Sequence, residues 1–190
     1  MSKFTIFIIV IVVGFFGFAV FRKSSQPKEA IIGVQHPEQA RNHIPRGQKH
    51  DPYNSDPASS GPHYADSGAP TSWGTYVEEV PDEVFLHNEE HGGMVVTYNP
   101  QLLPADQLKK LRALFAAPSS NKDFSPGKFI LTPRSKDTHA IELASWRWTM
   151  NLDGYDEATL MKFFRQHVGQ SPEPAAGPSV NQIINQAAGQ

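Results

Sequence analysis

The sequence contains no cysteine. This absence excludes every chemistry that needs a thiolate from this chain, including a Cys nucleophile, an iron–sulfur cluster, a C-x-x-C redox pair and a blue-copper centre. It is compatible with an oxidising compartment but does not establish one, because extracytoplasmic domains without disulfides can be stable through their cores alone.

Motifs for nucleotides and for serine hydrolases are also missing. The chain has no P-loop, no dinucleotide-binding glycine pattern and no G-x-S-x-G turn. Positive charge is scarce after the N-terminal part: residues 50–190 hold ten Lys and Arg against seventeen acidic residues. Because phosphate binding needs a positive surface, we predict that nucleic acid is not a partner.

One long hydrophobic run is present near the N-terminus. From Phe4 to Phe21 every residue except Thr5 is apolar or small, and at about 1.5 Å per residue this run nearly spans a ~30 Å hydrocarbon core. Arg22-Lys23 stands where a cleavable signal would need small residues. We predict a single transmembrane anchor over 4–21 in the plasma membrane, although Lys3 matches Arg22-Lys23 and leaves the orientation open.

The remaining chain divides by composition into three parts. Residues 22–50 carry scattered charges without a sustained period, which favours a juxtamembrane linker. Residues 51–170 hold the apolar patterns of one domain, and residues 171–190 are rich in Pro, Ala, Gln and Gly, which predicts a flexible tail.

The apolar patterns of the domain predict an α+β fold. We expect one helix that opens at Pro104 and a second that is capped by Asp156, because leucines and phenylalanines recur at helical spacing after each. Between the strands at 128–132 and 140–146 lies a polar turn, which favours a hairpin. The prediction is a small antiparallel sheet of about four strands with two helices on one face. The expected strands are 84–86, 94–98, 128–132 and 140–146.

The densest chemical signal is the segment His87-Asn88-Glu89-Glu90-His91-Gly92-Gly93-Met94. His87 and His91 are four apart, so their ring nitrogens could converge on one cation. The glycines allow a close approach of the backbone, and Met94 could add a soft thioether, which would favour copper. His63, which follows a Gly-Pro bend, is the best third imidazole. We predict a metal site of His63, His87, His91 and Met94, with copper favoured over zinc.

Three neighbouring residues are expected around these ligands. Glu90 would orient an imidazole, and Tyr64 and Trp73 would line or shield the site. The order H-x-x-E-H also occurs in inverted zinc peptidases, where the Glu acts as base. That hydrolase hypothesis requires a long helix, which Gly92-Gly93 ends at once. We therefore predict no catalytic residue and favour a binding protein over an enzyme.

A second hypothesis is an accessory or assembly subunit of a membrane protein complex. Gly14 and Gly17 would allow another membrane helix to approach closely. The loop-rich region 51–81 and the Gln-rich tail would then contact partner subunits, and the histidines would form a structural hydrogen-bonded cluster.

Several short motifs together resemble a bacterial family of membrane-anchored domains of unknown function, family 3105. The resemblance implies an anchored domain on the extracytoplasmic side, and it marks His63, His87 and His91 as the imidazoles of interest. Glu89 stands where the family pattern has an apolar residue. The motifs are Tyr53-Asn54-Ser55, Ser60-Gly61-Pro62-His63-Tyr64, Trp73-Gly74-x-Tyr76, His87-Asn88-x-Glu90-His91-Gly92-Gly93 with the strand Val95 to Tyr98, Ala144-Ser145-Trp146, and Ser171-Pro172-Glu173.

Overall fold

A computed structural model describes residues 29–116 and 127–174 of the chain. The chain divides into two units, Met1–Ile31 and Ile32–Gln190, and the helices and strands described below belong to the second. Among the described helices, none has the length and apolar character needed to cross a bilayer. The anchor expected over 4–21 and the tail beyond residue 174 lie outside the described residues.

The domain is organised around a mixed six-stranded sheet with the order β1-β8-β7-β5-β6-β4. The central strand β5 runs parallel to β6 and antiparallel to β7. All five residues of β5 are buried, as expected for a strand covered on both faces. The strands are β1 (Val34–Gln35), β4 (Gly74–Thr75), β5 (Met94–Tyr98), β6 (Phe129–Pro133), β7 (Ile141–Ser145) and β8 (Trp148–Leu152).

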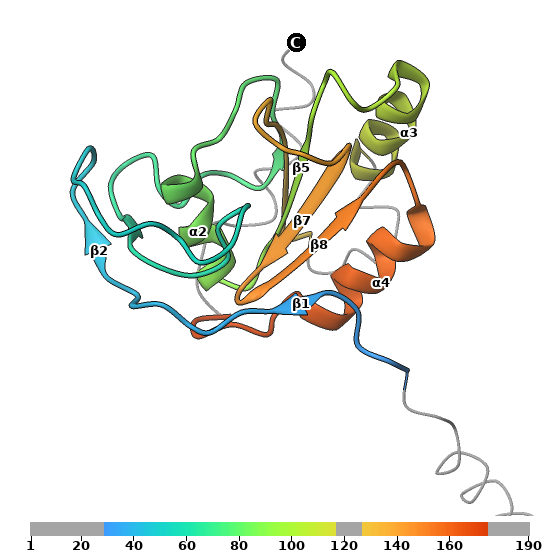
Figure 1. Cartoon of the computed structure of the whole chain (residues 1–190). Helices are drawn as coiled ribbons and strands as arrows, with labels where there is room; N and C mark the ends of the chain where they lie inside the picture. Colours follow the sequence, from blue (N-terminus) through green and yellow to red (C-terminus); the bar gives the residue numbers. More distant parts are fainter. Residues whose placement is uncertain (1–28, 117–126, 175–190) are drawn as a thin grey trace, which may run out of the picture. The chain divides into compact units, whose positions relative to one another are not determined.

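Three described helices cover the two faces of this sheet: α2 (Asp82–Glu90), α3 (Ala105–Ala116) and α4 (Glu157–His167). Figure 1 shows α2 on one side of the sheet and α3 and α4 on the other. Alternate side chains of β5 point to opposite faces of the sheet. Val96 packs in the core beneath α3 and α4, and Val95 packs in the core beneath α2.

A second, smaller sheet lies beside α2. It pairs β2 (His43–Ile44) with β3 (His63–Tyr64) in parallel, so that His43 is directly opposite His63. Both β1 and β2 fall within residues 22–50, the range expected to be a linker, and β1 pairs with β8 of the main sheet.

The expectation of a four-stranded antiparallel sheet with two helices on one face is wrong. The helix α3 carries the chain from β5 to β6, and such a crossover lets the two strands pair in parallel. The strand β5 therefore lies between β6 and β7, so these two strands do not form the hairpin that the sequence predicts. The hairpin instead joins β7 to β8 through Trp146 and Arg147.

Two local features hid this arrangement from the sequence. The β7–β8 turn places Arg147 at a φ of 68°, a conformation that turn rules assign to Gly or Asn. Val84-Phe85-Leu86 reads as a short strand but lies inside α2. Pro81 precedes this helix and acidic residues occupy its first turn, which are signals of a helix start. The cap of α4 is confirmed, since Asp156 accepts a hydrogen bond from the Thr159 amide.

Candidate metal centre

His63 is fixed by the turn that leads into β3. Its side chain is fully buried, and its Nδ1 lies 2.9 Å from the Gly61 carbonyl oxygen. A Cβ at Gly61 would lie 2.8 Å from the Tyr53 ring, and the Tyr53 hydroxyl donates to the Pro62 carbonyl at 2.6 Å. Since a carbonyl only accepts, Nδ1 carries the proton and Nε2 of the neutral ring presents a lone pair.

His87 and Glu90 lie three residues apart on α2 and therefore project from the same side of the helix. The His87 Nδ1 lies 2.7 Å from the Tyr64 carbonyl oxygen, so the same reasoning leaves its Nε2 as an acceptor. The Glu90 side chain is 4% exposed. The main chain of β3 thus orients the imidazole of α2, as carbonyl partners of metal-binding histidines do.

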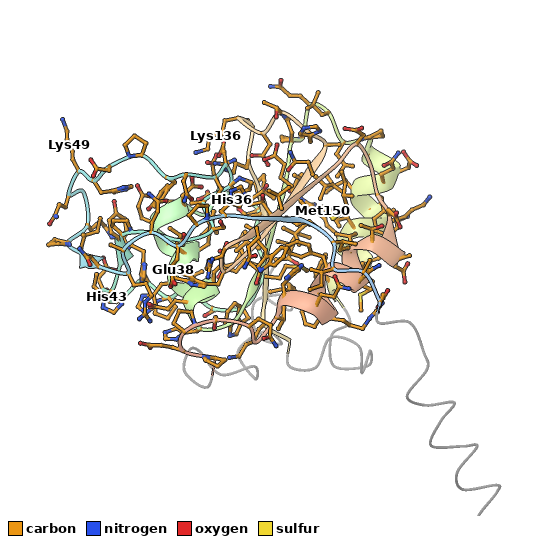
Figure 2. All side chains as sticks on the ribbon, turned by 60° about the horizontal axis from the view of Figure 1, so that its bottom comes forward. His36, Glu38, His43, Lys49, Lys136 and Met150 are labelled. Carbon is orange, nitrogen blue, oxygen red and sulfur yellow. The ribbon has the colours of Figure 1, made fainter. Side chains whose placement is uncertain are left out.

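His43 completes the cluster from β2. Its ring centroid lies 4.9 Å from that of His63 and 4.9 Å from that of His87, while its side chain remains 53% exposed. Figure 2 shows His43 at the side of the molecule where β2 and α2 lie. One potential ligand atom from each of His43, His63, His87 and Glu90 lies within 4.8 Å of all the others.

The electrostatics of this cluster favour a bound cation. The His63 Nε2 lies 3.1 Å from Glu90 Oε2, and the His43 Nε2 lies 3.6 Å from the same oxygen. Burial lowers the pKa of His63, and burial above all lowers the pKa of His87 to about 4, against the opposing effect of the Tyr64 carbonyl. At neutral pH both rings are neutral, so a lone pair of His63 faces the carboxylate. A cation between them would satisfy both acceptors.

The other two predicted ligands, His91 and Met94, are not part of this cluster. The His91 ring centroid is 4.8 Å from that of His87, but His91 is outside the cluster of four, and its Nδ1 lies 3.4 Å from the Glu173 carbonyl oxygen. Met94 is fully buried in the core beneath α3 and α4, across the sheet from α2. The structure thus brings His63 and His87 together and does not bring His91 or Met94 to the same point.

The three residues expected around the ligands have different positions. Glu90 belongs to the cluster itself. Tyr64 contributes its carbonyl to His87, and its ring lies beneath the guanidinium of Arg46 at 4.7 Å. Trp73 is fully buried in the core beneath α2, where its ring lies so close to Gly93 that a Cβ there would be 2.3 Å away.

Sequence reasoning missed His43 because it fell in the range expected to be a linker. Its strand has two residues, too few for any periodicity to appear. The contact with His63 depends on a parallel pairing between segments about twenty residues apart. Histidine was visible at position 43, but nothing nearby predicted a strand.

The C-terminal end of α2 is held by the segment 169–174. The Glu173 amide donates to the Glu90 carbonyl at 3.0 Å, and the Gly169 amide donates to the Gly92 carbonyl at 2.9 Å. The Lys128 ammonium donates to the His91 carbonyl at 2.7 Å. These contacts satisfy carbonyl groups that a helix end leaves without partners, and they fix the turn that carries Glu90.

The opposite end of α2 is held by charge. The buried Arg134 guanidinium lies 3.1 Å from Asp82, the first residue of α2, and also pairs with Asp56 and Asp137. Both ends of the helix are therefore tied to segments distant in sequence, which restricts the movement of His87 and Glu90 relative to β3.

Glu89 differs from its neighbour Glu90. Its side chain is fully buried, and neither carboxyl oxygen has a hydrogen-bond partner among the described residues. Burial, followed by the charge of Asp82, raises the pKa of Glu89 well above its usual value. Burial therefore disfavours the charged form of Glu89, and Glu90 is the glutamate that belongs to the cluster.

Comparison with known proteins gives a single answer. No curated protein and no solved structure matches the chain. A family model matches residues 43–180, a range that begins at His43 and includes all four residues of the cluster. Because this match covers well over half of the chain, the protein belongs to the family described as "Protein of unknown function (DUF3105)".

Proposed function

We propose that this domain binds one divalent transition-metal ion through His43, His63, His87 and Glu90. The observation that carries the proposal is the 3.1 Å approach of two acceptors, His63 Nε2 and Glu90 Oε2, in a buried site where the other nitrogen of His63 is already occupied. Without a cation or an added proton, this approach would be unfavourable.

The donor set bears on the identity of the metal. Three imidazole nitrogens and one carboxylate oxygen suit copper(II) and zinc(II), whereas copper(I) prefers the thiolate and thioether ligands that this cluster lacks. For a given nitrogen and oxygen site, copper(II) binds more tightly than zinc(II). The proposed ion is therefore copper(II), with zinc(II) as the weaker alternative.

The arrangement of the ligands supports binding and exchange of the ion more than turnover. Four protein donors fill a four-coordinate shell, whether square-planar for copper(II) or tetrahedral for zinc(II), whereas catalytic zinc sites keep one position open for water or substrate. His63, His87 and Glu90 are buried, while the His43 side chain is 53% exposed. The half-exposed His43 is the ligand by which the ion would enter and leave.

Location and partners stay predictions. The anchor over 4–21, which would place the domain on the extracytoplasmic side of the plasma membrane, lies outside the described residues. The accessory-subunit hypothesis depends on the same segment. A tethered domain with an exchangeable copper(II) site would fit metal handling at the membrane surface.

The proposal is tested by metal titration of the full chain after treatment with a chelator. Calorimetry with copper(II) and then with zinc(II) should give about one equivalent of each, with copper(II) the tighter. His43→Ala and Glu90→Gln should each weaken copper(II) binding by about tenfold or more, which corresponds to about 1.4 kcal/mol.

His139→Ala is the matched control, because His139 is also partly exposed but pairs with Asp153 outside the cluster. Its affinity for copper(II) should equal that of the wild type. Unchanged stoichiometry and affinity in both His43→Ala and Glu90→Gln would refute the proposed ligand set.

A further inference from the structure

A groove of about 540 Å³ lies beside the metal centre. The segment after β1 and the segment after α4 form its sides, the turn between β7 and β8 contributes Trp146 and Arg147, and β8 contributes Trp148. Figure 1 shows the segment after β1 in blue and the segment after α4 in red at the same end of the sheet, and Figure 2 labels Glu38 on the former. The volume is within the range typical of sites for small molecules.

Two arginines in the lining have unused hydrogen-bonding capacity. The Arg147 Nε donates to the His36 carbonyl at 3.2 Å, and its other guanidinium nitrogens have no acceptor among the described residues. Arg41 lies 3.7 Å from Glu38 and 4.0 Å from Glu90, but makes no hydrogen bond within the described part of the chain. A guanidinium group carries five donors and has a strong preference for planar anions.

The backbone at Arg147 supports a role beyond packing. Arg147 is the only residue other than glycine with a positive φ among those described, at 68°. Such a conformation is uncommon for a residue with a side chain and is often found where a side chain must be held in place. Here the Arg147 amide donates to the Ser59 carbonyl at 2.7 Å, which holds the turn beneath the groove.

We propose that this groove binds a small organic carboxylate, with its acidic group on Arg41 and Arg147 and its apolar body against the half-buried Trp148, while the edge of the buried Trp146 lines the groove. The charge of the lining selects a singly charged ligand. The lining holds these two guanidinium groups and one carboxylate, Glu38, which also accepts a hydrogen bond from the Trp146 indole at 3.1 Å. The resulting net charge of about +1 balances one carboxylate and leaves a doubly charged phosphate undercompensated.

This site goes beyond the proposed metal function and does not require it. Arg41 lies near Glu90, and Trp146 lies edge-on to His63 with ring centroids 6.5 Å apart. The ligand would therefore sit next to the metal centre, with the Trp146 ring between them. Binding to the groove should occur with or without a metal ion.

The test uses the three tryptophans of the chain. N-acetyl-phenylalanine is titrated into the ¹⁵N-labelled full chain, and the indole N–H signals are followed by NMR. The signals of Trp146 and Trp148 should move, whereas that of Trp73, buried beneath α2, should not. N-acetyl-phenylalaninamide, which lacks the charge, should bind about tenfold more weakly or worse.

Two variants test whether Arg41 and Arg147 bind the carboxylate group. Arg41→Gln and Arg147→Gln should each raise the Kd for N-acetyl-phenylalanine by about tenfold. Lys49→Gln is the matched control, because it removes one positive charge at an exposed position away from the groove (Figure 2) and should leave the Kd unchanged. Arg41 is partly exposed, so its variant remains informative if Arg147→Gln fails to fold.

Three results would overturn the proposal. The first is equal binding of the acid and its amide, and the second is tighter binding of inorganic phosphate than of the carboxylate. The third is binding that occurs with zinc(II) present but not in chelator-treated protein, since the metal would then hold the carboxylate. If the wild-type protein binds the carboxylate but does not bind a metal ion, only the proposed metal function is refuted.

Discussion

The two faces of the main sheet are built from different kinds of residue. On one face, α4 buries Leu160, Met161, Phe163 and Phe164 in an apolar core. On the other, α2 buries every residue from Val84 to Glu90, including four consecutive polar residues at its C-terminal end. The α4 face contributes mainly burial of apolar surface, whereas the α2 face contains polar groups that need partners.

This difference shows where stability and chemistry lie in the domain. Apolar burial on the α4 face is non-directional, so its contribution depends on volume and fit. Polar burial on the α2 face depends on the position of each hydrogen bond, because an unpaired buried group is costly. Substitutions on the two faces should therefore have different consequences.

The largest effect is expected on the α4 face. Phe163→Ala removes a fully buried ring and should lower the free energy of unfolding by about 3–5 kcal/mol, through lost burial and the cavity that remains. Urea denaturation measures the change. Leu102→Ala, at a side chain that is 49% exposed, should cost less than about 0.5 kcal/mol. Similar losses in both variants would contradict the assignment of this face as the main core.

The next effect concerns the proposed metal site on the α2 face. At a free copper(II) concentration of 100 times the Kd, the wild type should gain about 2.7 kcal/mol in free energy of unfolding. With a Kd weakened tenfold, His43→Ala should lose about half of this gain, and more if the Kd rises further. Without metal, its free energy of unfolding should match that of the wild type within about 0.5 kcal/mol, because the His43 side chain is half-exposed. If copper(II) stabilises both proteins equally, His43 is not a ligand.

Glu89 allows the polar face to be made more like the apolar one. Glu89→Leu replaces a buried carboxyl group that lacks a partner among the described residues and should raise the free energy of unfolding by about 1–3 kcal/mol. Glu89→Gln keeps a buried polar group and should give no such gain. A destabilised Glu89→Leu variant that still binds copper(II) would show that the carboxyl group has a stabilising partner.

The smallest effect is a pH dependence that arises on the α4 face. His167 is buried against Trp148 and Phe163, with ring centroids 4.6 and 4.4 Å away. Burial lowers the pKa of His167 below its usual 6.5, although the bond from its Nε2 to the Ile32 carbonyl opposes this. A lowered pKa in the folded state means that stability is complete above pH 6.5 and is lost as the pH falls through the folded value.

His167→Phe should remove that part of the pH dependence. The free energy of unfolding of each protein is measured in urea between pH 7.5 and 5. As the pH falls, the wild type should lose stability relative to the variant. A constant difference across this range would show that His167 does not titrate differently in the folded and unfolded states.

The sequence predicted the apolar face better than the polar one. The helices α3 and α4 follow from leucine and phenylalanine spacing, and Asp156 follows from its capping role, because these signals are local. The parallel pairing of β5 with β6 depends on how α3 packs, and no local pattern encodes that. The order of the strands was therefore beyond the reach of periodicity.

The candidate site divides in the same way. His63, His87 and Glu90 stand in conspicuous motifs, and the sequence alone singled them out. His43 belongs to the cluster because β2 pairs in parallel with β3 over two residues. Met94 does not belong to it, because the alternation of side chains along β5 directs Met94 to the opposite face of the sheet. Tertiary contacts decide which polar residues lie close together in the fold, and residue type alone does not reveal those contacts.

The contact between the end of α2 and segment 169–174 also has a consequence for biosynthesis. The ribosome makes Glu173 82 positions after His91, which at about 5–20 residues per second is a delay of roughly 4 to 16 seconds. Until then, the helix turn that carries Glu90 lacks its last hydrogen-bond donors. A nascent chain therefore contains all four residues of the cluster well before it can make the contacts that hold the C-terminal end of α2, and a chain that terminates before residue 169 lacks those contacts.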